Sequence, residues 1–169
     1  MATYRILVPL DGSEFSRQAV RHVCRLFRPT DCEVTLFRAA DEPAGVVAAP
    51  PRDLVFGSIL LSSFGSKLEM GQAEHPIYAS QVWETTVAAL KDELQADARV
   101  LQDAGYTASV EVRFGDPAEE IAQCVEDRDI DLVVMATHGR TGLKRFVLGS
   151  VAEQVLRSLD IPVMLVRPV

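Results

Sequence analysis

The chain has 169 residues, a length typical of one domain with a core large enough to fold without disulfides or a structural metal. Its apolar fraction of 48% and charged fraction of 24% are ordinary for a globular protein. The net charge of −7 argues against general binding to nucleic acid or to an anionic membrane, because both require a basic surface. It leaves room for a local pocket that binds a small anion.

The cysteines and the hydropathy indicate where such a protein works. Cys24, Cys32 and Cys124 are widely spaced and form no Cys-x-x-Cys motif, which favours reduced structural thiols in a cytosolic protein. No segment approaches 18 continuous apolar residues, and the first residues lack the pattern of a signal peptide. We therefore expect a cytoplasmic location and no membrane span.

The first part of the chain alternates between strand and helix patterns. Residues 4–10 are a short apolar run that predicts a buried strand, and residues 33–39 predict a second one. Ser13 is placed to cap a helix between them. Apolar residues recur there every three or four positions and predict one buried helix face, made of Phe15, Ala19, Val23 and Leu26.

Residues 42–76 interrupt this alternation. The segment is rich in Pro, Gly and Ser and holds only short apolar islands, and it is long for a connection without structure of its own in a compact domain. We expect a single domain over residues 1–169 with an insertion at about 42–76. This insertion is a lid, a dimer contact or a segment without a function of its own.

The alternation resumes after the insertion. A helical period over residues 81–104 ends at Gly105, and it predicts a buried face made of Trp83, Val87, Leu90, Leu94 and Leu101. Residues 107–114 alternate like a strand with one wetter face. A helix to about Glu126 follows, and its start has the capping pattern of Asp116, Pro117 and Glu119.

The last part of the chain completes an α/β pattern. Residues 130–136 are the most continuous apolar run, which is typical of a strand buried on both faces of a parallel sheet. Residues 150–159 predict a helix that begins with Ser150 in a capping box, and residues 161–169 predict a strand with Pro162 at its start or on an edge. Such alternation predicts a parallel sheet with helices on both faces.

Two strand ends carry residues that suit a nucleotide. In parallel α/β sheets, ligands bind at the carboxyl ends of the strands where the strand order reverses. Asp11, after the first strand, can accept hydrogen bonds from a sugar or a base. Gly139, Gly149 and Ser150 follow the fourth strand and can offer backbone and hydroxyl donors to phosphates near a helix N-terminus.

Each of these residues also has a purely structural interpretation. Asp11 could form only a turn and a helix cap, Gly139 and Gly142 could be turn glycines, and Ser150 could serve only its capping box. The basic residues among the glycines could belong to a solvated helix face, and they are Arg140, Lys144 and Arg145. The joint spacing of the residues carries the nucleotide hypothesis.

Several other kinds of site are excluded by spacing. The histidines are not paired at the spacing of zinc ligands, and they are His22, His75 and His138. The chain has no G-x-S-x-G elbow, no Walker A motif and no G-x-G-x-x-G fingerprint. A phospho-acceptor receiver domain needs an Asp and a Lys at strand ends where this chain has Gly115 and Arg167.

The glycine-rich stretch resembles the ATP-binding signature of the universal stress proteins, G-x2-G-x9-G-[S/T]. Gly139 takes the second glycine position, nine residues follow, and Gly149 with Ser150 closes the signature, whereas Ala136 stands at the first glycine position. The resemblance extends to the ILVPLDGS start, to the Gly-Asp-Pro-Ala-Glu turn at residues 115–119 and to the IPVMLVRPV tail.

This resemblance implies a fold and a ligand. It implies a five-stranded parallel sheet of order 3-2-1-4-5, Rossmann-like and similar to the adenine nucleotide alpha hydrolases, and a homodimer formed through residues 162–167. It also implies ATP or AMP, with or without Mg²⁺, in the crevice between the first and fourth strands. The nucleotide contacts that we expect are Pro9, Leu10, Asp11, Ala39, Ala136, His138, Gly139, Arg140, Gly142, Gly149, Ser150 and Val151.

We therefore expect a universal stress protein that binds adenine nucleotide and acts as a dimeric regulatory module. The alternative is a stress protein that binds no nucleotide and works as a dimeric protein-interaction module. A slow ATPase would need His138 or Asp11 to position water, and we do not expect the chain to be an enzyme. We also expect no metal site built by the protein, no nucleic acid partner and no membrane partner.

Overall fold

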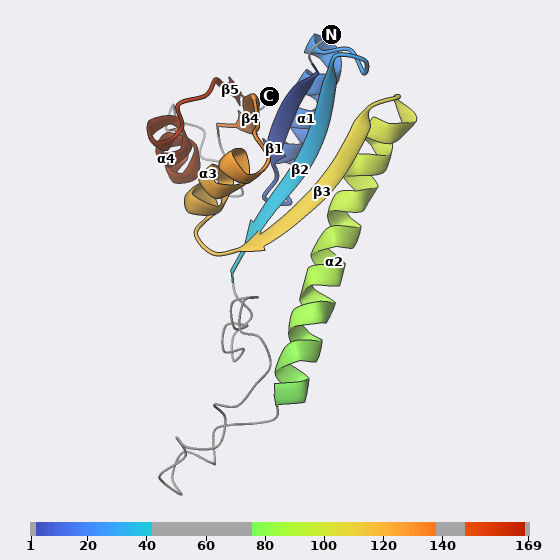
Figure 1. The fold of residues 1–169 in the computed structure, drawn as a ribbon, viewed down its shortest axis with the longest axis vertical. Coiled ribbons are helices and arrows are strands. Elements are labelled where there is room, and N and C mark those ends of the chain that lie inside the picture. Colours follow the sequence, from blue (N-terminus) through green and yellow to red (C-terminus); the bar gives the residue numbers. More distant parts are fainter. Residues whose placement is uncertain (1–2, 42–75, 138–147, 168–169) are drawn as a thin grey trace, which may run out of the picture. The chain divides into compact units, whose positions relative to one another are not determined.

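The computed structural model describes residues 3–41, 76–137 and 148–167 (Figure 1). The chain divides into two compact units: Met1–Asp41 together with Ala89–Val169 forms the first, and Glu42–Ala88 forms the second. The sheet and the candidate site belong to the first unit. Most of the insertion predicted at about 42–76 lies outside the described residues.

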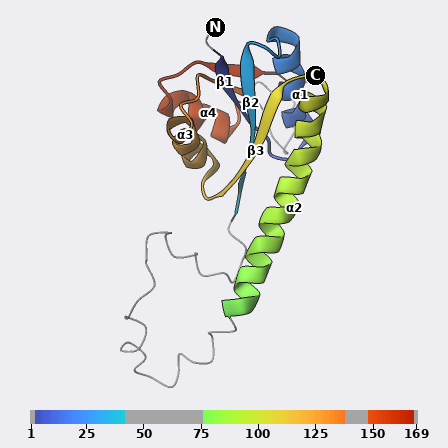
Figure 2. The same cartoon turned by 45° about the vertical axis from the view of Figure 1, so that its right-hand side comes forward.

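A five-stranded parallel sheet of order β3-β2-β1-β4-β5 confirms the predicted topology (Figures 1 and 2). Its strands are β1 (Tyr4–Pro9), β2 (Cys32–Ala40), β3 (Thr107–Phe114), β4 (Leu132–Ala136) and β5 (Val163–Val166). The strand order reverses between β1 and β4, which is the position where parallel α/β sheets open a crevice at their carboxyl ends.

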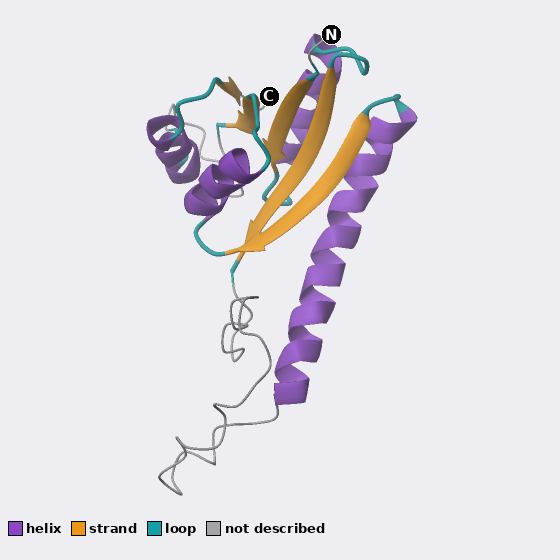
Figure 3. Cartoon of the chain, in the orientation of Figure 1, coloured by secondary structure: helices purple, strands orange, loops and turns teal. Residues whose placement is uncertain are grey.

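Helices cover both faces of this sheet. They are α1 (Glu14–Leu26), α2 (Pro76–Asp103), α3 (Pro117–Asp127) and α4 (Ser150–Ser158). The sheet face that α1 shares with the later turns of α2 is opposite the face that carries α3 and α4 (Figure 3). Helix α2 begins at Pro76 rather than at residue 81, and proline suits this position because the first helical turn does not need its N–H.

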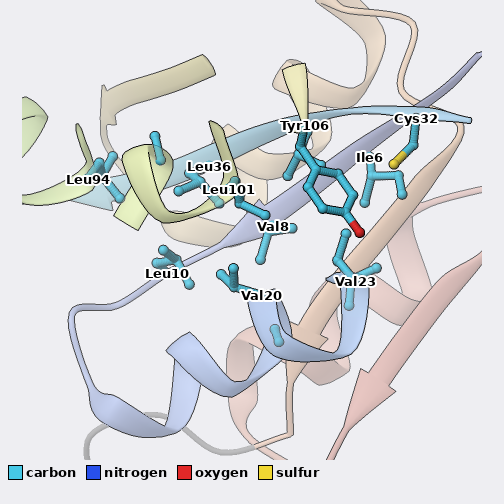
Figure 4. Packing of buried hydrophobic residues seen from close by; sticks show 14 of the residues in the cluster. Ile6, Val8, Leu10, Val20, Val23, Cys32, Leu36, Leu94, Leu101 and Tyr106 are labelled. Atoms are coloured by element: carbon cyan, nitrogen blue, oxygen red, sulfur yellow. The ribbon is translucent and has the colours of Figure 1, made fainter. Parts of the chain in front are cut away.

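Alternation along the strands builds two cores. Ile6 and Val8 of β1 face α1 and α2, where they pack with Leu94 and Leu101 (Figure 4). Leu7 points the other way and packs among residues of α3 and α4. Both faces of the central strands are therefore buried, and each fully buried aliphatic side chain stabilises the fold by about 1.5–3 kcal/mol.

The predicted buried face of α1 is wrong at its two ends. Phe15 is 39% exposed and Leu26 is 56% exposed, although Ala19 and Val23 are fully buried. The buried stripe is narrower and shifted, and it consists of Ser16, Ala19, Val20 and Val23. Residues at positions 15 and 26 lie roughly 80° from the centre of this stripe on a helix of 3.6 residues per turn.

Two of the three predicted N-caps are confirmed. The Ser13 side chain accepts a hydrogen bond from the N–H of Ser16, and Asp116 accepts from the N–H groups of Ala118 and Glu119. The predicted capping box at Ser150 is wrong. Gly149 is the N-cap of α4 and Ser150 is the first helical residue, so the Ser150 hydroxyl does not cap the helix.

Candidate functional site

A cavity of about 270 Å³ lies at the carboxyl ends of β1 and β4, at the reversal of strand order. Its wall combines strand ends, the start of α3 and the start of α4. The lining residues are Pro9, Leu10, Asp11, Ser16, Phe37, Ala39, Pro117, Ile121, Met135, Ala136, Thr137, Gly149, Ser150, Val151 and Ala152. The structure thus brings together eight of the predicted contacts: Pro9, Leu10, Asp11, Ala39, Ala136, Gly149, Ser150 and Val151.

Asp11 reaches the cavity from a tightly bonded turn. Its Oδ1 accepts hydrogen bonds from the Ser13 N–H at 2.9 Å and from the Ser13 hydroxyl at 2.6 Å. The Ser16 hydroxyl donates to the Ser13 carbonyl at 2.9 Å and accepts a hydrogen bond from the Asp11 N–H at 3.3 Å. The turn-and-cap interpretation of Asp11 is therefore correct for this oxygen, and the same turn presents the residue at the cavity wall.

The N-terminus of α4 supplies the opposite part of the wall. The Gly149 N–H donates to the Thr137 carbonyl at 2.9 Å, and the Gly149 carbonyl accepts from the Glu153 N–H at 2.9 Å. Gly149 therefore has no N–H to offer a ligand, contrary to the expectation from the sequence. The unsatisfied donors of the first helical turn are the N–H groups of Ser150, Val151 and Ala152.

These donors carry the positive end of the helix dipole, which favours an anion at this position. They belong to residues that line the same cavity as Asp11. Donors for an anion and an acceptor for hydroxyl or amino groups are thus combined in one site. This combination suits a polar ligand with a negatively charged end.

Most of the remaining wall is apolar, and the sequence did not predict most of the residues that form it. Phe37, Ile121 and Met135 line the cavity and are each at most 5% exposed. Ala39 was predicted, and Phe37 lies two residues before it on the same face of β2. That period of two is a signal from which Phe37 could have been inferred. Ile121 could not, because α3 reaches the cavity only through tertiary packing.

Four predicted contacts lie outside the described residues, and they are His138, Gly139, Arg140 and Gly142. Lys144 and Arg145 lie there as well. The described part of the wall contains one ionisable side chain, that of Asp11. The described wall therefore offers backbone N–H groups, not side-chain cations, to an anion.

The thiols lie apart from the cavity wall. Cys32 and Cys124 are buried and Cys24 is exposed, and all three are free. Burial raises the pKa of each thiol, and it raises that of Cys124 to about 11. Protonated thiols are poor nucleophiles and poor metal ligands, which agrees with a structural role.

The model of the universal stress protein family matches residues 3–55 and 65–167 of the chain. The chain belongs to this family. Universal stress protein MJ0577 of Methanocaldococcus jannaschii is 30% identical over 164 residues, which cover 96% of this chain and 94% of the relative. Its solved structure has a TM-score of 0.70 and 25% identity, and it covers 100% of this chain and 99% of that one.

Two other universal stress proteins with solved structures share the fold at lower identity. One, solved in complex with cAMP, has a TM-score of 0.59 and 18% identity, with 99% of this chain and 98% of that one covered. The other, from Arabidopsis thaliana and solved with AMP bound, has a TM-score of 0.57 and 16% identity, with 98% and 92% covered. Both support the Rossmann-like α/β architecture.

Within this universal stress protein, no helix of the described ranges is both long and apolar enough to cross a bilayer. Among the same residues, no group of three His, Cys, Asp or Glu side chains is arranged to hold a metal ion. Ala136, the departure from the glycine signature, is the last residue of β4 and pairs with Val166. It lines the cavity and is half-buried.

Proposed function

We propose that this universal stress protein binds an adenine nucleotide, ATP or AMP, in the cavity between β1 and β4. In this proposal, nucleotide occupancy regulates a dimeric module of the stress response in the cytoplasm. One observation carries the proposal: Asp11 and the free N–H groups of the α4 N-terminus line the same cavity, and the rest of its described wall is mostly apolar.

The described residues fit the parts of an adenine nucleotide. The apolar wall of Phe37, Ile121 and Met135 suits the base, and Asp11 suits the hydroxyl groups of the ribose. The N–H groups at the start of α4 suit a phosphate, because they combine free donors with the positive end of the helix dipole. The AMP and cAMP found in two family members with this fold support the same class of ligand.

We also propose that the protein is a regulator rather than an efficient enzyme. Hydrolysis of ATP requires a group that orients the attacking water within about 3 Å. Asp11 is the one carboxylate of the described wall, and its Oδ1 already accepts two hydrogen bonds from Ser13. Phosphate release no faster than in a protein-free control would support this part of the proposal.

The homodimer belongs to the proposal as well. β5 is the last strand in the sheet order, so among the residues that the structure describes no strand pairs with its outer edge. Its sequence is apolar over Val163–Val166, and its residues are partly exposed except Val166. An exposed apolar edge favours pairing with a second copy, and residues 162–167 would form that contact.

The nucleotide proposal is tested by two measurements on the purified protein. Mass spectrometry of the gently purified and then denatured protein should detect adenine nucleotide, and calorimetry of the nucleotide-free protein should show ATP or AMP binding below millimolar concentration. Asp11→Asn should weaken this binding. Asp129→Asn is the matched control, because it makes the same change on an exposed residue at the opposite end of β1.

A protein that carries no nucleotide and shows no binding at millimolar ATP or AMP would contradict the proposal. The alternative function, a dimeric interaction module without nucleotide, would then stand.

A further inference from the structure

Arg38 is a buried cation on the face of β2 opposite the cavity. Its side chain points toward α1 and α2, because it follows Leu36 in the alternation of the strand, and the residue is only 8% exposed. Within the described part of the chain, no hydrogen bond or ion pair holds its guanidinium group. None of the described residues has a side-chain nitrogen or oxygen that is both buried and unpartnered, so the guanidinium nitrogens of Arg38 reach solvent although most of the residue is covered.

The guanidinium group lies directly against the backbone of Gly12. A Cβ atom on Gly12 would lie 2.5 Å from Nη1 and 3.0 Å from Nη2 of Arg38, and 3.1 Å from Oε1 of Glu93. Gly12 has a φ of +81°, in the left-handed region that favours glycine. The backbone conformation therefore favours glycine here, and a side chain at this position would also have to displace the flexible end of the Arg38 side chain.

A second arginine holds Gly12 from α1. Arg17 Nη1 lies 3.4 Å from the Gly12 carbonyl oxygen, while its Nε donates to both Asp97 carboxylate oxygens at 3.2 Å and 3.0 Å. Its Nη2 donates to Glu93 at 3.1 Å. The hydrogen bond to Asp97 is the main cause of the raised pKa of Arg17, so this cation stays charged. Glu93 and Asp97 belong to α2, and Gly12 is therefore braced between three elements.

Gly12 is the residue next to Asp11. Asp11 lines the cavity, whereas neither Arg38 nor Arg17 does. A movement of Gly12 out of its left-handed conformation would disturb the two hydrogen bonds from Ser13 that hold the Asp11 carboxylate, because Gly12 lies between these two residues. The contacts on the α1 and α2 face are thus mechanically connected to the cavity on the other face.

We propose that Arg38 is a positioning residue for the nucleotide site: with Arg17 it clamps Gly12, and the clamp fixes Asp11 at the cavity wall. This inference rests on the proposed function for its ligand. It adds that the acidic residues of α2, Glu93 and Asp97, influence nucleotide affinity without touching the nucleotide, because they hold Arg17 in place.

The test replaces Arg38 by Met, which keeps the length of the side chain and removes the guanidinium group. We expect a roughly tenfold weaker affinity for ATP or AMP by calorimetry. In the Asp11→Asn background, Arg38→Met should cause no further loss, because Arg38 acts through Asp11. Arg38→Lys should recover part of the affinity. Arg25→Met, the same change on an exposed residue of α1, is the matched control and should leave affinity unchanged.

A second measurement needs no nucleotide. In ¹⁵N NMR spectra of the nucleotide-free protein, Arg38→Met should shift the amide signals of Gly12 and Ser13 and speed the hydrogen exchange of the Ser13 N–H, which donates to Asp11. The amide signals of β5 should stay in place. This readout tests the clamp even if the protein binds no nucleotide, and Arg38→Lys replaces Arg38→Met if the latter does not fold.

Three outcomes would overturn the proposal. Unchanged signals of Gly12 and Ser13 in a folded variant would show that Arg38 does not hold the turn. Unchanged nucleotide affinity of Arg38→Met would show that the clamp does not serve the site. An equal loss of affinity with and without the Asp11 carboxylate would show that Arg38 acts on the ligand by another route.

Discussion

Gly149 donates its backbone N–H to the carbonyl oxygen of Thr137 over 2.9 Å, and this bond joins the start of α4 to the end of β4. Thr137 donates its own N–H to the Val166 carbonyl over 2.9 Å, so β5 is connected to the same corner. These two hydrogen bonds at Thr137 determine where the free N–H groups of α4 lie relative to the cavity. A Cβ atom on Gly149 would lie 3.2 Å from the Thr137 oxygen, which is a tight contact.

Gly149→Val should therefore weaken nucleotide binding at least tenfold, which corresponds to about 1.4 kcal/mol. The added side chain must push α4 away from Thr137 and displace the N–H groups that face the cavity. Calorimetry with ATP or AMP measures the effect, and Gly149→Ala should show a smaller one. Circular dichroism verifies the fold of both variants. Unchanged affinity in folded Gly149→Val would contradict the placement of the phosphates.

Asp116 caps α3 whereas Ser150 does not cap α4, so the two residues should contribute differently to stability. Asp116→Ala should lower the free energy of unfolding by about 1 kcal/mol, because the Asp116 carboxylate accepts two hydrogen bonds from the first turn of α3. Ser150→Ala should change it by less than about 0.5 kcal/mol, because this hydroxyl does not cap α4. Urea denaturation of both variants compares them directly. An equal loss of unfolding free energy in both variants would show that the Ser150 hydroxyl does cap α4.

The elements that the sequence predicted well have local signals. The apolar run of β4 needs burial on both faces, and the caps at Ser13 and Asp116 are built by bonds to residues two or three positions away. The N-cap of α4 could not be derived in this way. It is Gly149 because a long-range bond to Thr137 fixes it there, and that bond depends on how β4 and α4 meet.

The residues of the candidate site likewise divide into those with a local sequence signal and those placed by long-range packing. Asp11 and Ser150 could be predicted because they stand at a strand end and at a helix start. The part of the apolar wall that Ile121 contributes could not, since it exists only after α3 packs on the sheet. The contact of Arg38 with Gly12 could not be predicted from local sequence, because it joins β2 to the loop after β1.

The thiols should differ in their reactivity toward iodoacetamide. Cys24 is exposed, whereas Cys32 and Cys124 are at most 1% exposed and burial raises their pKa, so that neither offers an accessible thiolate near neutral pH. Mass spectrometry of the native protein should find one alkylated cysteine, and three after unfolding in urea. Cys24→Ser should abolish labelling of the native protein. Rapid native labelling of Cys124 would contradict its burial on the inner face of α3.

Glu120 should make stability depend on pH. Burial raises its pKa above the usual value of 4.5, and the nearby Arg113 only partly opposes this effect. The folded protein therefore holds this proton more tightly than the unfolded chain, and stability falls as pH rises from about 4.5 through the raised pKa. Glu120→Gln should flatten this fall.

Urea denaturation across that pH range measures the difference between wild type and Glu120→Gln. Glu126→Gln is the control, because it makes the same change at an exposed position of α3. A fall in stability that stays as steep in Glu120→Gln as in the wild type would show that Glu120 is not its source.

The direction of the backbone groups in β5 allows a sharp test of the proposed dimer. Val133 and Thr137 donate hydrogen bonds to the carbonyls of Pro162 and Val166, so these two residues face β4. Backbone groups alternate in direction along a strand, so the N–H and carbonyl of Val163 face the outer edge. A second copy that pairs along this edge would use the Val163 N–H.

Val163→Pro removes that outward N–H and leaves the hydrogen bonds between β5 and β4 in place, as proline is tolerated on the outer side of an edge strand. Light scattering should give twice the chain mass for the wild type and a single chain mass for Val163→Pro. Val163→Ala is the matched control: it shortens the side chain but keeps the N–H, and it should remain dimeric. A folded Val163→Pro variant that stays dimeric would show that the contact does not run along β5.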